Sequence, residues 1–288
     1  MGRLDGQIAL IAGGSGGLGK AVAVAFARAG SALVLVGRNE NALTGTVSAC
    51  REAGVRAYSA IADVRRWDQV EHVVREVEAH FGPTDILVNA TGILTPIGSL
   101  AHVDPAEWAD SVQVNLIGAF HLCRAVAPHM SERRRGKIIL FSGGGATAPF
   151  PQFSAYAAAK AGVVRLAETL AEEMKDFDVQ VNAIAPGLVD TPLQDAVLAA
   201  GSRAGSQLPR VKHARETGAG AVPPQLAAEL AVFLASPDSG QLTGKLISAP
   251  HDPWREWQSR GEELNATPLF TLRRLDPFTL ATVAEAPD

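Results

Sequence analysis

The stretch Ile8-Ala-Leu-Ile-Ala-Gly-Gly-Ser-Gly-Gly-Leu-Gly19 decides the fold. Its first five residues are continuously apolar, which is typical of a parallel strand that is buried on both faces. Glycines follow, and residues 20–30 then have the Ala-rich pattern of a helix that ends at a glycine. A strand, a glycine turn and a helix in this order predict a pyrophosphate cradle, because glycines admit a close backbone approach and a helix N-terminus offers unpaired N–H groups.

The glycines of this turn fit two spacings of a phosphate-binding motif. One spacing is Gly14-x-Gly16-x-x-Gly19, and the other is Gly13-x-x-x-Gly17-x-Gly19. Glycine-rich turns also occur as plain linkers, so the turn acquires its meaning from its place between a strand and a helix. The residues of the turn alone leave the two registers open.

The rest of the chain repeats the alternation of strand and helix. Further short apolar runs predict strands at residues 32–36, 57–60, 86–89, 137–141, 179–185 and 245–248. Helices are expected at about residues 67–80 and 104–130, around Tyr156, and at 224–235, with Asp104 and Pro105 as the N-cap and first residue of the second. About seven strands and about six helices predict a single α/β domain over residues 1–250, built on a doubly wound parallel sheet of the Rossmann type.

Two segments depart from this alternation. Residues 188–224 are rich in Gly, Ala and Ser and lack a sustained period, so we expect an irregular lid over a site. Residues 251–288 form a C-terminal extension that holds Trp254 and Trp257, and it is too apolar to be a free tail. We expect the extension to pack on the domain or on a neighbouring subunit, and to border a substrate pocket there.

Composition and charge exclude several classes of function. The chain has 288 residues and a net charge of −4 without a basic stripe, so nucleic acid is not an expected partner. The two cysteines and the scattered histidines lack metal-ligand spacing, and no metal site is expected. No apolar run approaches the ~18 residues needed to span a bilayer. The first strand begins by Ile8, which we take to leave no room for a signal peptide, and we expect a cytoplasmic protein.

The chemistry is predicted from the stretch Ser154-Ala-Tyr-Ala-Ala-Ala-Lys160. Helical spacing places the Tyr156 phenol and the Lys160 ammonium on one face, one turn apart. A free phenol has a pKa of about 10, and a cation nearby lowers that pKa, which makes a tyrosine usable as a general acid or base. Taken alone, the pair is more often the decoration of a helix surface, so the other motifs have to support this interpretation.

Three further positions stand where a dinucleotide would lie. Arg38 follows the second predicted strand, where an acidic residue would bind the ribose 2′-OH of NAD, and an arginine there favours a 2′-phosphate. Asp63 and Val64 follow the third strand and are placed to close over an adenine. Asn115 is a polar residue on an otherwise apolar side of its predicted helix.

Together these motifs resemble the short-chain dehydrogenase/reductase family over about residues 4–250. The family motif TGxxxGxG is similar to Ala12-Gly13-x-x-x-Gly17-Leu18-Gly19, which selects the second glycine register. The motif NNAG is similar to Asn89-Ala90-Thr91-Gly92, and the Pro-Gly after the sixth strand is Pro186-Gly187. The cofactor-binding residues that the resemblance implies are Gly13, Ser15, Gly17, Leu18, Gly19, Arg38, Asp63, Val64, Asn89, Gly92, Tyr156, Lys160, Pro186, Gly187, Val189 and Thr191.

The resemblance also implies an activity. Hydride would pass between NADP(H), favoured over NAD(H), and a ketone or secondary alcohol. Tyr156 would act as the general acid or base, Lys160 would bind the nicotinamide ribose and keep the tyrosine pKa low, and Asn115 would support a water that relays protons. The family further implies a small-molecule substrate and a homotetramer or homodimer. A sugar or nucleotide-sugar substrate is a narrower alternative within the same activity.

One departure from the family concerns catalysis. The active-site serine of the family lies thirteen residues before the tyrosine, and that position here is Gly143. Ser142 lies one residue earlier and would point to the opposite face of an unshifted strand. We expect that a bulge brings Ser142 round as the fourth catalytic residue. The alternatives are that backbone N–H groups of residues 143–145 bind the substrate oxygen, or that catalysis is weakened and the protein is a cofactor-binding sensor or scaffold.

Overall fold

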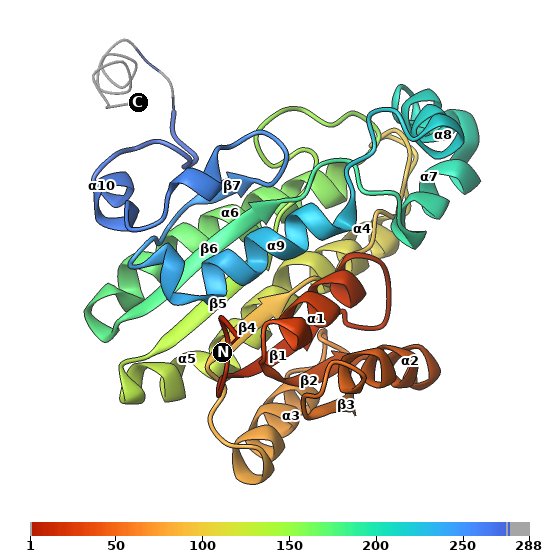
Figure 1. Ribbon diagram of the computed structural model, residues 1–288. Helices are drawn as coiled ribbons and strands as arrows, with labels where there is room; N and C mark the ends of the chain where they lie inside the picture. Colours follow the sequence, from red (N-terminus) through yellow and green to blue (C-terminus); the bar gives the residue numbers. More distant parts are fainter. Residues whose placement is uncertain (1, 275, 277–288) are drawn as a thin grey trace.

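Parallel strands form a sheet of seven in the computed structural model, which describes residues 2–274 and 276. The strand order β3-β2-β1-β4-β5-β6-β7 reverses direction between β1 and β4, as in doubly wound folds (Figure 1). The predicted fold class is therefore confirmed. The strands are β1 (Ile8–Ala12), β2 (Ala32–Gly37), β3 (Ala57–Ile61), β4 (Ile86–Asn89), β5 (Gly136–Phe141), β6 (Val179–Ala185) and β7 (Leu246–Ser248).

Helices cover both faces of the sheet. One apolar cluster joins the sheet to α1 (Gly17–Arg28), α2 (Glu40–Arg51) and α9 (Pro224–Ala235). A second cluster joins the other face to α3 (Trp67–His80), α5 (Gly118–Arg133) and α6 (Ser154–Met174). Successive residues of β1 alternate between the two clusters, so this central strand is buried from both sides and reads as a continuous apolar run. The edge strand β3 is more exposed, with Tyr58 and Ile61 open to solvent.

Helix α2 is not among the helices that the sequence pattern predicts. Its buried residues Leu43, Thr46, Val47 and Cys50 recur at helical spacing, but the segment Thr44-Gly45-Thr46 has low helix propensity. Packing on the sheet therefore overrides the local preference of this segment. The side chain of Asn39 accepts a hydrogen bond from the Ala42 amide and begins the helix.

The predicted helix over residues 104–130 contains an irregular turn. Asp104 caps α4 (Pro105–Val112) by accepting hydrogen bonds from the amides of Ala106 and Glu107, at 2.7 and 3.0 Å. A π-helical turn, Gln113–Ile117, then connects α4 to α5 without a break in the helical chain. Single π turns inside α-helices are frequent at functional sites, and this one contains Asn115.

The segment 188–224 is helical in part, which corrects the expectation of an irregular lid. It contains α7 (Asp195–Ala200) and α8 (Gln207–Thr217), whose buried residues are mostly small and leave a weak periodic signal. The Arg215 side chain ties α8 to Asp190 in the chain before α7 and to Asp195, the first residue of α7, through ion pairs at 2.6 and 2.7 Å. The segment thus has a defined shape over the carboxyl ends of the strands (Figure 1).

The described part of the C-terminal extension packs against its own domain. Trp254 and Trp257 are buried in the same apolar cluster as α1 and α9. The Lys245 ammonium, at the edge of the sheet, donates to the carbonyls of Thr267 and Leu269 at 2.8 and 3.1 Å. A short helix, α10 (Gly261–Asn265), lies between these contacts, and the rest of the predicted extension lies outside the described residues.

No helix among the described residues is long and apolar enough to cross a membrane. The same residues contain no group of three or more His, Cys, Asp or Glu side chains arranged to hold a metal ion.

Candidate active site

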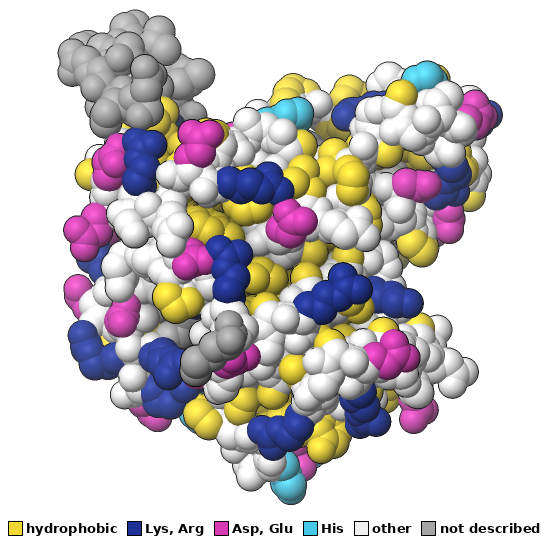
Figure 2. All heavy atoms as spheres, in the orientation of Figure 1, with side chains coloured by type: hydrophobic (Ala, Val, Ile, Leu, Met, Phe, Trp, Pro, Cys, Tyr) yellow, Lys and Arg dark blue, Asp and Glu magenta, His cyan; other side chains and the backbone are white. Residues whose placement is uncertain are grey.

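A cleft of about 970 Å³ runs along the carboxyl ends of the strands. Figure 2 shows the molecule hollowed between the part that carries α7 and α8 and the part that carries α1 and α2. The predicted site residues that line this cleft are Gly13, Ser15, Gly17, Leu18, Arg38, Asp63, Val64, Gly92, Ser142, Tyr156, Lys160, Pro186, Gly187, Val189 and Thr191. The other three predicted residues do not line the cleft but contact residues that do: Gly19 lies against Gly13, Asn89 is hydrogen-bonded to Thr91, and Asn115 is hydrogen-bonded to Ile93.

The glycine turn between β1 and α1 fits a group that approaches the backbone closely. Gly13 has a φ of +83°, and a Cβ there would lie 2.8 Å from the backbone of Ala90. A Cβ on Gly19 would lie 2.1 Å from the Gly13 carbonyl oxygen, and Gly17 has a φ of +51° where α1 begins. Because these three positions exclude side chains while Gly16 meets nothing within 4 Å, the structure supports the register Gly13-x-x-x-Gly17-x-Gly19.

Asn89 shapes the turn that follows β4. Its side-chain oxygen accepts hydrogen bonds from the Thr91 amide at 3.1 Å and from the Thr91 hydroxyl at 2.6 Å. The turn leaves Gly92 so close to the residues behind it that a Cβ would lie 2.9 Å from Asn115 Oδ1. A glycine at this position therefore lets the cleft reach Lys160, whose Nζ would be 3.5 Å from the same Cβ.

Tyr156 and Lys160 lie one turn apart on α6, and both are almost fully buried. The Lys160 ammonium donates to the Phe141 carbonyl at 2.9 Å and to the Thr91 carbonyl at 3.4 Å. Its nitrogen lies 5.7 Å from the centroid of the Tyr156 ring. The two side chains thus meet where β4 and β5 end.

The protonation of this pair differs from the expectation. We expect Lys160 to lower the Tyr156 pKa, but in the structure burial raises the pKa of Tyr156. Burial also lowers the pKa of Lys160 to about 8. The reason is that removal from water disfavours both the phenolate and the ammonium. The structure therefore holds a neutral phenol beside an ammonium that loses its proton in a mildly alkaline range.

Asn115 fixes the loop that follows β4. Its side-chain nitrogen donates to the carbonyls of Ile93 and Ser111 at 2.9 and 3.0 Å, and its oxygen accepts from the Ile93 amide at 3.2 Å. Asn115 is fully buried, and the π-helical turn brings it to this position. Its role in a water relay stays a prediction.

The end of β5 corrects the expectation of a bulge at Ser142. The Ser142 amide donates to the Ile184 carbonyl at 2.8 Å, which continues the pairing of β5 with β6 without a shift of register. The Ser142 hydroxyl is buried without a hydrogen-bond partner. A Cβ on Gly143 would lie 2.1 Å from the Tyr156 hydroxyl. The position that faces the phenol is therefore 143, and the phenol fills the space that a side chain there would need.

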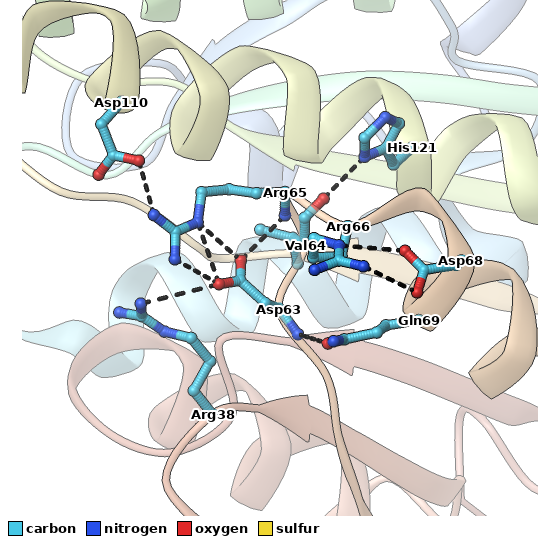
Figure 3. A network of polar contacts seen from close by, with 9 residues as sticks. All are labelled: Arg38, Asp63, Val64, Arg65, Arg66, Asp68, Gln69, Asp110 and His121. Carbon is cyan, nitrogen blue, oxygen red and sulfur yellow. Dashed lines mark hydrogen bonds and ion pairs between the residues drawn. The ribbon is translucent and has the colours of Figure 1, made fainter. Parts of the chain in front are cut away.

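The end of the cleft at which we expect the adenine contains a network of charged groups (Figure 3). Arg38 is largely exposed, and its Nη1 lies 3.9 Å from Asp63 Oδ2. The Asp63 amide donates to Gln69 Oε1 at 2.8 Å, and His121 Nδ1 lies 2.8 Å from the Val64 carbonyl. The pKa of Asp63 lies below its usual value, chiefly because the Arg65 side chain donates hydrogen bonds to it. Asp63 is thus an ionised carboxylate between two guanidinium groups.

Several residues of the site are not found by sequence patterns. Behind the cleft, Arg65 contacts both Asp63 and Asp110 of α4, and the Trp108 indole donates to the Ser154 hydroxyl at 3.1 Å where α6 begins. The cleft itself is lined in addition by Gln207 and Arg210 of α8 and by His251 of the extension. Among the described residues after Pro250, His251 lines it, so the extension borders the pocket at this position. None of these residues belongs to a motif whose spacing is local.

Comparison with known proteins relates the chain to a protein family. The family profile described as short chain dehydrogenase matches residues 7–200. A 3-oxoacyl-[acyl-carrier-protein] reductase of Thermotoga maritima is 32% identical over 251 residues, which cover 85% of this chain and 96% of that protein. The short-chain reductase protein NovJ of Streptomyces niveus is 36% identical over 242 residues, which cover 84% of this chain and 91% of that protein.

Solved structures agree with these relatives. An NAD+-bound xylitol dehydrogenase matches with a TM-score of 0.79 and 28% identity, over 85% of this chain and 98% of the other. A variant of actinorhodin polyketide ketoreductase with NADPH matches with a TM-score of 0.78 and 30% identity, over 86% and 97% of the two chains. Both nicotinamide dinucleotides thus occur among the structures that this chain is similar to.

Proposed function

The chain belongs to the short-chain dehydrogenase family and is a nicotinamide-dependent oxidoreductase, and we propose that it acts on a ketone or secondary alcohol with NADP(H). The observation that carries this proposal is the buried pair Tyr156 and Lys160 at the carboxyl ends of β4 and β5. A proton donor and an ammonium stand there beside a glycine cradle, which is the chemistry that carbonyl reduction requires.

The chain supplies a place for each part of the dinucleotide. Amides of the glycine turn and the first turn of α1 would bind the pyrophosphate. Asp63 and Val64 would line the adenine, and the segment from Pro186 to Thr191 would line the nicotinamide. When bound, the nicotinamide gives or takes the hydride.

Tyr156 moves the proton in this proposal. Because burial keeps its phenol neutral, Tyr156 is ready to donate a proton to the oxygen of a carbonyl substrate. In the reverse direction the phenolate has to form, and the Lys160 ammonium stabilises it by electrostatic attraction. The carbonyls of Phe141 and Thr91 hold that ammonium in place, and Asn115 holds the backbone of Ile93 beside them.

The substrate oxygen has fewer side-chain donors than is usual in the family. Position 143 has no hydroxyl, and the Ser142 hydroxyl follows an unshifted strand. We propose that Tyr156 and backbone N–H groups of residues 143–145 bind the oxygen, with Ser142 as the remaining candidate. One missing oxyanion donor costs about 3–4 kcal/mol of transition-state stabilisation, which slows a reaction and does not abolish it.

The preference for NADP(H) rests on the end of β2. Arg38 stands there without an acidic neighbour on the strand end, and its guanidinium is exposed to the cleft. A guanidinium binds a phosphate through paired hydrogen bonds, whereas a ribose hydroxyl is better bound by a carboxylate. Ser15 of the glycine turn lines the same end of the cleft.

Calorimetry with NADPH and NADH tests the proposal, followed by a panel of ketones and alcohols with the cofactor that binds. We expect tighter binding of NADPH in the wild type, reversal of that preference in Arg38→Asp, and turnover of at least one carbonyl. Equal binding of both cofactors by the wild type would contradict the preference for NADP(H). Binding without turnover of any member of the panel would contradict the proposed activity.

A further inference from the structure

The guanidinium of Arg65 holds Asp63 on one side of the adenine end of the cleft (Figure 3). Its Nε lies 3.0 Å from both carboxylate oxygens of Asp63, and its Nη2 lies 2.5 Å from Oδ2. The Arg65 amide donates to Oδ1 of the same carboxylate at 3.0 Å. Planar paired contacts of this kind are the strong form of an ion pair.

Arg65 is itself fixed from a second element. Its Nη1 lies 2.6 Å from Oδ1 of Asp110 on α4. The neighbouring Arg66 points away in Figure 3 and pairs with Asp68, with both contacts at 3.2 Å. Adjacent arginines therefore carry the same charge but face different partners, and Arg65 is the one beside Asp63.

This arrangement decides what Arg38 is free to do. Arg38 Nη1 lies 3.9 Å from Asp63 Oδ2, at the limit of an ion pair, while Arg65 makes the short contacts to that carboxylate. Without Arg65, the uncompensated Asp63 would attract Arg38 and would repel an anion bound beside it. With Arg65 in place, the charge of Asp63 is largely offset and the Arg38 guanidinium remains available.

We propose that Arg65 is a positioning residue for cofactor choice, which neutralises Asp63 and so leaves Arg38 to bind the 2′-phosphate of NADP(H). This inference rests on the proposed function, since it assigns the 2′-phosphate to Arg38. It concerns the ratio of the affinities for the two cofactors, because NADPH carries that phosphate and NADH does not. A role in folding alone would change both affinities together.

The test is calorimetric binding of NADPH and of NADH to the full chain carrying Arg65→Gln, with Arg66→Gln as the matched loss of one positive charge. We expect Arg65→Gln to lower the affinity for NADPH relative to NADH about tenfold, as for a partly screened unit charge near a phosphate. Arg66→Gln should change that ratio less than about twofold. Equal ratios in the two variants would overturn the inference.

A second variant tests whether Arg65 acts through Asp63. In the double variant Asp63→Asn with Arg65→Gln, the charge that Arg65 offsets is gone, so the ratio of NADPH to NADH affinity should return to within about threefold of its value in Asp63→Asn alone. Any loss of adenine contact affects both cofactors and cancels in the ratio. A double variant that keeps the full loss would overturn the inference. The wild-type ratio separately tests the proposed preference, whichever way the variants change it.

Discussion

One lysine lies at each end of β5, half-buried Lys137 at the amino end and buried Lys160 of α6 at the carboxyl end, and their surroundings differ. At the amino end, Lys137 donates to the Gly240 carbonyl at 2.8 Å and lies 3.4 Å from the Ser239 hydroxyl. At the carboxyl end, Lys160 donates to the Phe141 carbonyl and stands beside the Tyr156 phenol. Burial lowers the pKa of each lysine to about 8.

The difference lies in what else is buried there. At the amino end, Asp85 accepts hydrogen bonds from the Ile8 amide and from Arg133, so the charged groups are paired within the chain. At the carboxyl end, Lys160 stands beside the buried Tyr156 phenol and lines an open cleft, which Lys137 does not line. Each end also has a buried hydroxyl without a hydrogen-bond partner, that of Thr84 at the amino end and that of Ser142 at the carboxyl end. The two lysines have similar pKa values but different neighbours, and the neighbours of Lys160 are the reason that we propose a catalytic role for it and not for Lys137.

Replacing each lysine by methionine separates the two ends most sharply. Lys160→Met should lower kcat by about 10²–10³-fold, because the phenolate of Tyr156 loses its stabilising cation. Lys137→Met should leave kcat within about twofold, since position 137 lies at the far end of the strand. Steady-state turnover of a ketone from the panel measures both. Equal losses of kcat in the two variants would contradict a specific role of Lys160 in catalysis.

The carboxylate at the amino end should affect stability and not chemistry. Asp85→Ala leaves the Ile8 amide and the Arg133 guanidinium without their buried partner, and should lower the free energy of unfolding by about 2–4 kcal/mol. The exposed pair of Asp68 and Arg66 provides the control, and Asp68→Ala should change the free energy of unfolding by less than about 1 kcal/mol. Urea unfolding measures both, and kcat per folded molecule should be unchanged. A loss of kcat in Asp85→Ala would contradict the view that the amino end of the sheet contributes to stability and not to catalysis.

The lysine pKa values also predict a dependence of stability on pH. An unfolded lysine takes up its proton as the pH falls through about 10.4, whereas folded Lys137 and Lys160 do so at about 8. Between these values the unfolded chain binds more protons, so the free energy of unfolding rises with pH, by at most about 3 kcal/mol for each lysine. Below pH 8 the contribution is constant and at its least favourable. Urea unfolding at several pH values gives the free energy of unfolding as a function of pH. Between pH 8 and about 10, this free energy should rise less steeply in each Lys→Met variant than in the wild type. An equally steep rise would contradict the lowered pKa of the replaced lysine.

The smallest expected effect concerns Gly143. A Cβ at this position would lie 2.1 Å from the Tyr156 hydroxyl, so Gly143→Ala should displace the phenol and lower kcat about tenfold. A Cβ on Gly45 of α2 meets nothing within 4 Å, so Gly45→Ala should leave kcat unchanged. Gly143→Ser adds a hydroxyl together with the same Cβ. If Gly143→Ser turns over faster than Gly143→Ala, the Tyr156 side chain can move to make room for a serine at the position where the family has one.

The parts of the molecule that local patterns could predict are the strands and the motifs attached to them. The apolar runs of the strands, the glycine turn and the spacing of Tyr156 and Lys160 are each contained in a few consecutive residues, and the structure has them within a residue or two of the predicted places. The sequence pattern does not predict helix α2, because its segment Thr44-Gly45-Thr46 has low helix propensity. It does not predict helices α7 and α8 either, because their small buried residues give a weak periodic signal.

The parts that could not be predicted depend on contacts between distant residues. The pairing of Arg65 with Asp110 joins residues 45 apart, and the contact of position 143 with Tyr156 depends on the path of the chain after β5. The Tyr156 pKa depends on burial, which a sequence spacing of four does not give. Local spacing thus predicts which groups react, and the fold determines the electrostatics of those groups.

We propose above that the reaction at the carboxyl end of the sheet depends on the Tyr156 phenol. The most direct measurement is turnover of a ketone by Tyr156→Phe at saturating cofactor, with cofactor binding measured on the same preparation. We predict a loss of about 10³-fold or more in kcat, with cofactor affinity within about threefold of the wild type. Turnover by Tyr156→Phe at the wild-type rate would contradict the claim.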